Sequence, residues 1–308
     1  MPCYGQGPAM TSSATTEPAP RDQGLTPRGR SADVVGMAEE LDTRTRGRTA
    51  RGRLRALDAY LCQFEAGLLT RDDGPWARAV FVDVGFGEHP WTTLESATAF
   101  RALSPELSIV GVELEAERAV AAARDHADAR THFREGGFAL PLSPDEPARL
   151  VRAMNLLRQG PPERIPEAHR AMSRHLLPGG LLVEGSSDTD GAVLVAHLLR
   201  RTPDAGTPAR EGLLFHTDFS RGFAPLLLRD WLPRDLRRRV RPGEPIHAFF
   251  QAWEAAWKAA RAEGHTQPPD AFAESVLRLA RMTQGVSTDA WLLTRGCLRW
   301  SPPGGTPA

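Results

Sequence analysis

Short apolar runs alternate with segments whose apolar residues recur at helical spacing, from about residue 50 to residue 185. Apolar runs bounded by turn residues are typical of buried strands, and the amphipathic segments are typical of helices. The predicted strands are residues 79–82, 108–112, 131–133, 150–154 and 181–184, and the predicted helices are residues 54–68, 92–103, 115–124 and 166–177. Strands separated by helices indicate βαβ units, so we expect an α/β fold with a doubly wound, mainly parallel sheet and helices on both faces.

The last third of the chain is less regular. Its expected elements are a helix, a strand and two further helices, at residues 192–200, 212–216, 246–262 and 271–282. Four aromatic side chains lie close to one face of the first of the two long helices, and we interpret them as core: Phe249, Phe250, Trp253 and Trp257. Residues 291–293 and 297–298 are candidates for a final edge strand.

Composition limits the class of protein. Hydrophobic residues make up 41% and charged residues 25%, which suits a soluble globular protein with a core. Lys+Arg and Asp+Glu are both 38, and a net charge of zero removes the simplest argument for a dedicated polyanion binder. The three cysteines form no CxxC pair, which argues against a disulfide framework or a zinc ribbon and favours a reducing, cytoplasmic compartment. No apolar run is long enough to predict a membrane span, and the N-terminus lacks the layout of a secretion signal.

Ligands of open α/β sheets bind at the carboxyl ends of the strands, so the residues that follow each predicted strand carry the chemistry. Asp83 ends the first strand, and Gly85 and Gly87 then allow a sharp turn and a close approach of the backbone to a ligand. The following helix offers free N–H groups to an anionic group. Because Pro90 holds the place of the third glycine of a dinucleotide fingerprint, that class of site is disfavoured.

Glu113 ends the second predicted strand. An acidic side chain at this place can accept hydrogen bonds from both hydroxyls of a ribose. The alternative is a solvated loop glutamate, like the neighbouring Glu115 and Glu117. The glycine loop upstream favours the ribose role.

Two motifs carry a resemblance to a known family. Asp83-x-Gly85-x-Gly87, together with the run Leu-Leu-Pro-Gly-Gly-Leu-Leu at residues 176–182, is similar to class I S-adenosylmethionine-dependent methyltransferases over about residues 75–185. The overall layout resembles an uncharacterised bacterial methylase-like branch. The resemblance implies S-adenosyl-L-methionine as cofactor, held by Asp83, Gly85, Gly87, His89, Glu113, Gly137, Phe138 and Asn155. It also implies that Phe138 could stack on the adenine and that Asn155 lies near the site of methyl transfer.

The resemblance assigns no catalytic residue. A general base is required only if the acceptor is protonated at the working pH. Acidic and imidazole side chains near strand ends are candidates, although each is better explained singly as a cap, turn or surface residue: Glu184, Asp188, Asp190, His216 and Asp218. The proline and glycines of the 176–182 run are expected to end the preceding helix in a left-handed turn. No metal-binding motif is present, so no metal is predicted.

These observations predict a methyltransferase acting on a small-molecule acceptor, with Rossmann-like topology and added N- and C-terminal helices. The expected divisions are a disordered tail, a helical extension, a cofactor-binding domain and a helical region that completes the same domain, at residues 1–47, 48–74, 75–220 and 221–308. A non-catalytic cofactor-binding or scaffold protein is the alternative. A nicotinamide-dependent oxidoreductase is disfavoured by Pro90. RNA methylation, using the arginines near residue 50 and at 237–241, is a further alternative that the balanced charge does not favour, and the oligomeric state is left open.

Overall fold

The central sheet has a parallel and an antiparallel half. The computed structural model describes residues 50–158, 160–203 and 207–302, in which eight strands form one sheet in the order β3-β2-β1-β4-β5-β6-β7-β8. They are β1 (Val80–Val84), β2 (Ile109–Glu113), β3 (Thr131–Glu135), β4 (Ala148–Met154), β5 (Leu176–Ser187), β6 (Val193–Arg200), β7 (Ala209–Thr217) and β8 (Cys297–Trp300). The pairs from β3 to β5 are parallel, and β6, β7 and β8 extend the sheet antiparallel. The predicted α/β sheet with a parallel core is confirmed.

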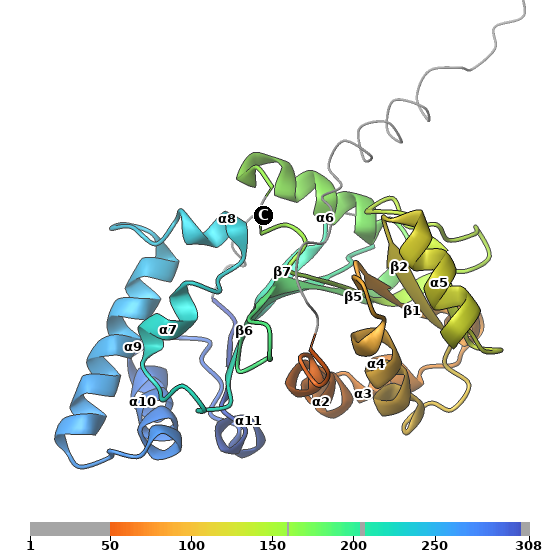
Figure 1. The fold of residues 1–308 in the computed structure, drawn as a ribbon. Helices are drawn as coiled ribbons and strands as arrows, with labels where there is room; N and C mark the ends of the chain where they lie inside the picture. The colour runs from red at the N-terminus through yellow and green to blue at the C-terminus, as the bar shows by residue number, and fades with distance from the viewer. Residues whose placement is uncertain (1–49, 159, 204–206, 303–308) are drawn as a thin grey trace, which may run out of the picture.

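Helices cover both faces of this sheet (Figure 1). They are α2 (Arg55–Phe64), α3 (Ala66–Thr70), η1 (Gly74–Arg78), α4 (Trp91–Arg101), α5 (Ala116–His126), η2 (Pro162–Arg164), α6 (Ile165–Ser173), α7 (Pro225–Arg229), α8 (Arg234–Arg237), α9 (Pro245–Ala262), α10 (Pro268–Met282) and α11 (Ala290–Thr294). Figure 1 shows α2, α3 and α4 on one side of the sheet and α6 on the other, with α7 to α10 gathered beside β6 and β7. None of the helices within the described ranges is long and apolar enough to cross a bilayer.

Alternation of side chains along the strands builds a separate core on each face. Phe81 meets Phe100 of α4 edge to face, with the ring centroids 5.0 Å apart. The next residue, Val82, points the other way and packs in the cluster that contains Met172 of α6. In the antiparallel half, Phe215 stacks on Phe249 of α9, with 5.3 Å between the ring centroids. Phe249, Phe250 and Trp253 are core, as predicted, whereas Trp257 is half-buried and lies outside this cluster.

Three predicted elements are wrong. Residues 192–200 form strand β6 rather than a helix, because every residue from Val193 to Leu199 is buried and an apolar run covered on both faces has no period that distinguishes strand from helix. Residues 291–293 belong to α11, and only the Cys297–Trp300 segment forms the edge strand. The helix predicted for 166–177 ends at Ser173.

The Pro-Gly-Gly segment at 178–180 therefore does not end a helix, as we expected. It lies inside β5, where the pairing with β4 shifts between Leu176 and Leu181. Gly179 has φ +91°, and its N–H donates to the carbonyl of Arg201 over 2.7 Å. The glycines thus form a bulge that leads the chain into the long central strand. The predicted tail, residues 1–47, lies outside the described residues.

Candidate functional site

The carboxyl ends of the parallel strands bring most of the predicted cofactor residues to one edge of the sheet. The strand order reverses between β1 and β4, which are neighbours although β2 and β3 lie between them in the sequence. Such a switch point is where open α/β sheets bind ligands. The loop from Gly85 to Pro90 follows β1, Glu113 ends β2, and Asn155 follows β4.

Glu113 is joined directly to the glycine loop. Its Oε2 accepts a hydrogen bond from the backbone N–H of Gly87 over 2.7 Å, and its Oε1 accepts one from the N–H of Leu114 over 3.0 Å. The residue is 0% exposed. Gly87 has φ +83°, a conformation that favours glycine. The structure therefore brings together two predicted site residues that lie 26 positions apart in the sequence.

Asp83 faces the interior rather than the loop. One carboxylate oxygen accepts hydrogen bonds from the hydroxyls of Thr92 (3.1 Å) and Thr93 (2.7 Å) at the start of α4. The other accepts from Nε of Arg152 over 2.9 Å. Asp83 thus fixes the helix that follows the glycine loop, and its contact with the cofactor stays a prediction.

Arg152 is a buried cation that sequence reasoning missed. It lies in β4, is 0% exposed, and its Nη1 donates to Asp58 Oδ1 (2.7 Å) and to Ser96 Oγ (2.8 Å). Burial raises the pKa of Asp58 to about 6, against the pull of Arg152. Asp83 and Asp58 in turn raise the pKa of Arg152 against the effect of burial. The available signal was an arginine among the apolar residues of the predicted strand 150–154, which required a buried partner.

Leu156 covers the first glycine of the loop. A Cβ placed on Gly85, which has φ +71°, would overlap the Leu156 side chain. The sequence predicted that a ligand approaches the backbone at Gly85, but the side chain of Leu156 lies there. Phe138 is 2% exposed and packs in the core cluster that contains Leu156, so its predicted stacking on adenine requires that the turn at residues 136–140 open.

Asn155 ties the ends of β4 and β5 together. It has φ +65°, its Nδ2 donates to the carbonyl of Ser187 over 3.0 Å, and its Oδ1 accepts from the N–H of Ser187 over 2.8 Å. A non-glycine residue in the left-handed region that makes a double bond to a neighbouring strand is a strained and specific arrangement. The positions where a methyl-transfer site was expected are therefore held rigidly.

The remaining predicted cofactor residues, Gly137 and His89, make fewer contacts with the rest of the site. The N–H of Gly136 donates to the Glu113 carbonyl over 3.0 Å, which places Gly137 beside the end of β2. The His89 side chain is 55% exposed and its ring lies 5.1 Å from that of Trp91. His89 is thus exposed beside Glu88 and Trp91, whereas Glu113 is buried.

Most candidate bases have structural partners. Glu184 lies on the face of the sheet that α6 covers, with its Oε2 3.5 Å from Nε2 of His169 on that helix. The buried Asp188 pairs with Arg221 over 2.9 Å, and the exposed Asp218 accepts from the N–H and hydroxyl of Ser220. Burial lowers the pKa of His216, which leaves it neutral at pH 7.

The N-terminal segment 51–54, here called the strap, crosses this edge of the sheet. The N–H of Gly52 donates to both carboxylate oxygens of Glu95 (2.9 and 2.8 Å), and the Arg51 guanidinium lies 3.7 Å from the Trp91 ring centroid. The strap then meets the β5–β6 turn, where a Cβ on Gly191 would collide with the Arg53 carbonyl. Two of the arginines near residue 50, which the sequence offered as possible RNA contacts, therefore make contacts within the fold.

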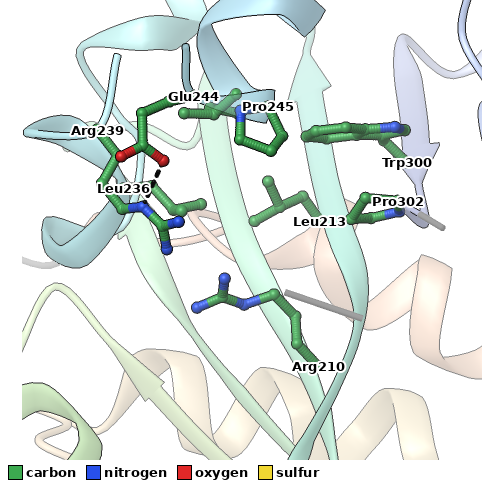
Figure 2. A pocket seen from close by; sticks show the side chains of 9 residues that line it. Arg210, Leu213, Leu236, Arg239, Glu244, Pro245, Trp300 and Pro302 are labelled. Atoms are coloured by element: carbon green, nitrogen blue, oxygen red, sulfur yellow. Dashed lines mark hydrogen bonds and ion pairs between the residues drawn. The ribbon is translucent and has the colours of Figure 1, made fainter. Parts of the chain in front are cut away.

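Neither of two cavities among the described residues is lined by any of the eight predicted cofactor residues. The larger is an open cleft of about 500 Å³ between α2, the β5–β6 turn and α11. The smaller, of about 10 Å³, holds little more than one water and lies beneath Trp300, beside the Arg239–Glu244 ion pair (Figure 2). We assign the smaller cavity to packing.

Comparisons with known proteins give only distant likenesses. No family model matches this chain, and no curated protein matches it. Among solved structures, the citrinin polyketide synthase CMeT domain is 17% identical over 37% of this chain and 30% of that chain, with a TM-score of 0.31. An S-adenosylmethionine-dependent methyltransferase from Mesorhizobium loti is 16% identical over 42% of this chain and 55% of that chain, with a TM-score of 0.29. The sugar N-methyltransferase KedS8 from Streptoalloteichus is 18% identical over 69% and 79%, with a TM-score of 0.30.

Many solved structures similar to this chain are thus methyltransferases of the kind that the sequence resemblance implies. The chain spans about a third of the first of these structures and about half of the second. TM-scores near 0.3 carry no conclusion about activity, so the function is inferred from the site itself.

Proposed function

We propose that the protein is an S-adenosylmethionine-dependent methyltransferase that acts on a small-molecule acceptor. The observation that carries the proposal is the hydrogen bond between Gly87 and Glu113 at the switch point of the sheet. It joins a carboxylate suited to the two ribose hydroxyls with a backbone turn suited to close approach. Both fit a nucleoside whose sugar lies at the end of β2.

The chain's own residues would divide the work of binding. Glu113 would exchange the Gly87 N–H for the ribose hydroxyls or share its oxygens with them, and the loop from Gly85 would meet the amino-acid part. Asn155 would hold the β4 and β5 ends where the acceptor approaches. The bound cofactor supplies a methyl group on a sulfonium with a good leaving group, so orientation and exclusion of water can supply much of the rate.

Calorimetric titration with S-adenosylmethionine and S-adenosylhomocysteine tests the proposal, with NADH as the control ligand. We expect the first two to bind wild type and the Glu113→Gln variant to bind them about 1–3 kcal/mol more weakly, since one charged acceptor of hydrogen bonds is lost. Glu117→Gln, an exposed change on α5, is the matched control and should bind like wild type. Failure of both adenosyl ligands to bind folded wild type refutes the proposal.

A second candidate function, a scaffold without catalysis, has one specific observation in its favour. Leu156 lies against Gly85, and Phe138 is packed in the core, so both positions are occupied by the chain itself. If this closure is permanent, Leu156→Ala should create the affinity for S-adenosylhomocysteine that wild type lacks. If the proposed function holds, wild type binds without that change.

A further inference from the structure

The cleft of about 500 Å³ opens at the same edge of the sheet as the cofactor residues, but over the antiparallel half. Its walls come from four parts of the chain: the strap with α2, the β5–β6 turn, the end of β7, and α11 with the start of β8. The volume lies within the usual range of small-molecule sites, roughly 300–1,000 Å³. Figure 1 shows α2 and α11, which form two of these walls, on the same side of the sheet.

One end of the cleft adjoins the predicted methyl-transfer position. Asp190 and Gly191 line it, and they follow Ser187, the residue that Asn155 holds by two hydrogen bonds. The strap closes this end, because Gly52 lines the cleft and the Arg53 carbonyl lies against Gly191. A molecule lying along the cleft would therefore have one end beside the carboxyl ends of β4 and β5.

The other end lies farther along the sheet. His216 is on β7, three strands from β4, and a strand spacing of about 4.8 Å places it roughly 14 Å from the β4 end. That separation is too large for His216 to take a proton from the reacting atom of a small acceptor. The far end can instead anchor the part of the acceptor that does not react.

The cleft carries two arginines and two carboxylates, and its arginines are the groups that can bind an anion. Its two arginines, Arg55 and Arg295, form no ion pair within the described part of the chain. Both of its carboxylates are engaged: Asp190 lies 3.7 Å from Arg221, and Asp218 accepts two hydrogen bonds from Ser220. A planar guanidinium binds a carboxylate through two parallel hydrogen bonds.

The far end also offers aromatic surface. Trp291 and Phe219 line the cleft and are partly exposed, and the Arg295 guanidinium lies 4.4 Å from the Trp291 ring centroid. An aromatic ring with a carboxylate matches this pairing of indole and guanidinium.

Among the described residues, the cleft contains one contact between a thiol and an imidazole, and the state of these two groups argues against a nucleophilic role. Cys297 Sγ lies 3.5 Å from His216 Nδ1, but burial raises the pKa of the thiol to about 12, so it stays protonated at neutral pH. Burial also lowers the pKa of His216. The pair is therefore neutral, and the cleft is built for binding.

We propose that this cleft binds the methyl acceptor lengthwise, as an aryl carboxylate anchored by Arg295 and Trp291, with its nucleophilic end at the Gly191 turn. The acceptor role rests on the proposed methyltransferase function, whereas the anionic aromatic site itself does not.

The probe for this site is 4-hydroxycinnamate, an elongated aryl carboxylate with a hydroxyl at the far end, and its methyl ester is the uncharged control. Binding to the full chain is measured by ligand-observed NMR, without and with S-adenosylhomocysteine. We expect the acid to bind wild type and to bind Arg295→Gln about tenfold more weakly or worse, as for loss of one charge-assisted hydrogen bond. The ester should bind wild type as weakly as the acid binds that variant.

Two further variants keep the result decisive. Thr294→Trp, an exposed change on the cleft wall, should block the probe without disturbing the core. Arg281→Gln on α10 removes an exposed arginine outside the cleft and should bind like wild type. Absence of acid binding to wild type, or equal binding to wild type and Arg295→Gln, overturns the proposal.

Failure of the proposed function and failure of the cleft assignment give different results. If the proposed function is wrong, S-adenosylhomocysteine does not bind, and the acceptor role falls while the arginine dependence of the probe remains. If only the cleft assignment is wrong, S-adenosylhomocysteine binds and the probe does not respond to Arg295→Gln.

Discussion

Arg152→Met tests most severely how the buried ion pairs stabilise the edge of the sheet where the predicted cofactor residues lie. The variant keeps a side chain of similar length but removes the cation that bonds Asp83 over 2.9 Å and Asp58 over 2.7 Å. Both carboxylates are buried, with side chains 4% exposed. Removing one partner of a buried ion pair usually costs about 3–5 kcal/mol, because the other charge stays buried.

Two features place the expected loss at the lower end of that range. Asp58, whose pKa burial already raises to about 6, can take up a proton. Asp83 keeps two hydroxyl donors, Thr92 and Thr93. We therefore expect Arg152→Met to lose about 3 kcal/mol of unfolding free energy near neutral pH. For a domain of this size, that corresponds to a fall in unfolding temperature of roughly 6–12 °C.

The loss should also depend on pH. Without Arg152, the folded-state pKa of Asp58 lies still further above its ordinary value of 3.8, so the folded state binds the proton more tightly than the unfolded state. The stability of the variant relative to wild type should then fall as the pH rises through that folded-state pKa. Urea unfolding at two pH values, one below 6 and one near 8, measures the difference.

Arg278→Met is the matched control for this prediction. Arg278 also contacts two carboxylates, Glu263 and Glu274, but on the surface of α10. Loss of Arg278 should change the unfolding temperature little, since ion pairs at the surface contribute little to the free energy of unfolding. If Arg152→Met were as stable as this control at the higher pH, the buried network would not hold the edge of the sheet.

Three further changes test separate parts of the account. Gly85→Ala should lower stability and weaken S-adenosylhomocysteine binding, because a Cβ at φ +71° overlaps Leu156; calorimetry and thermal unfolding that match wild type would contradict this. Asn155→Ala should destabilise the protein by about 1–3 kcal/mol in urea unfolding, since two bonds to the adjoining strand are lost at a strained position, and an unchanged midpoint would count against the clamp. Although burial alone would raise it, His197 holds the pKa of Asp235 well below its ordinary 3.8, so the unfolded state binds the proton more tightly. The stability advantage of wild type over Asp235→Asn should therefore be full above pH 3.8 and disappear as the pH falls through the folded-state pKa; an advantage that does not change with pH would refute the pairing.

Strands β1 and β2 of the parallel half could be predicted because each is a short apolar run that is followed by a helix. Strand β6 could not, because its residues from Val193 to Leu199 are buried on both faces and lack a distinguishing period. The Pro-Gly-Gly motif at 178–180 was recognised, but its role as a bulge depends on the pairing of β5 with β4 and Arg201, which no local pattern contains.

The candidate site divides in the same way. The proximity of Gly87 and Glu113 follows from their places after neighbouring parallel strands, so spacing was sufficient to predict it. The partner of Asp83 was not predictable, because Arg152 is brought to it by the packing of β4 against β1 beneath α2 and α4. Two further features likewise depend on tertiary contacts alone. Leu156 packs against Gly85, and the strap at residues 51–54 is bound to Glu95.

The most direct test of the central claim is amide hydrogen–deuterium exchange of the full chain with and without saturating S-adenosylhomocysteine. If the cofactor lies on the glycine loop and Glu113, the ligand should slow exchange in residues 84–92, 113–116 and 136–138, and leave α9 and α10 unchanged. Binding that protects only other segments, or no protection at the glycine loop and the end of β2, would contradict the account.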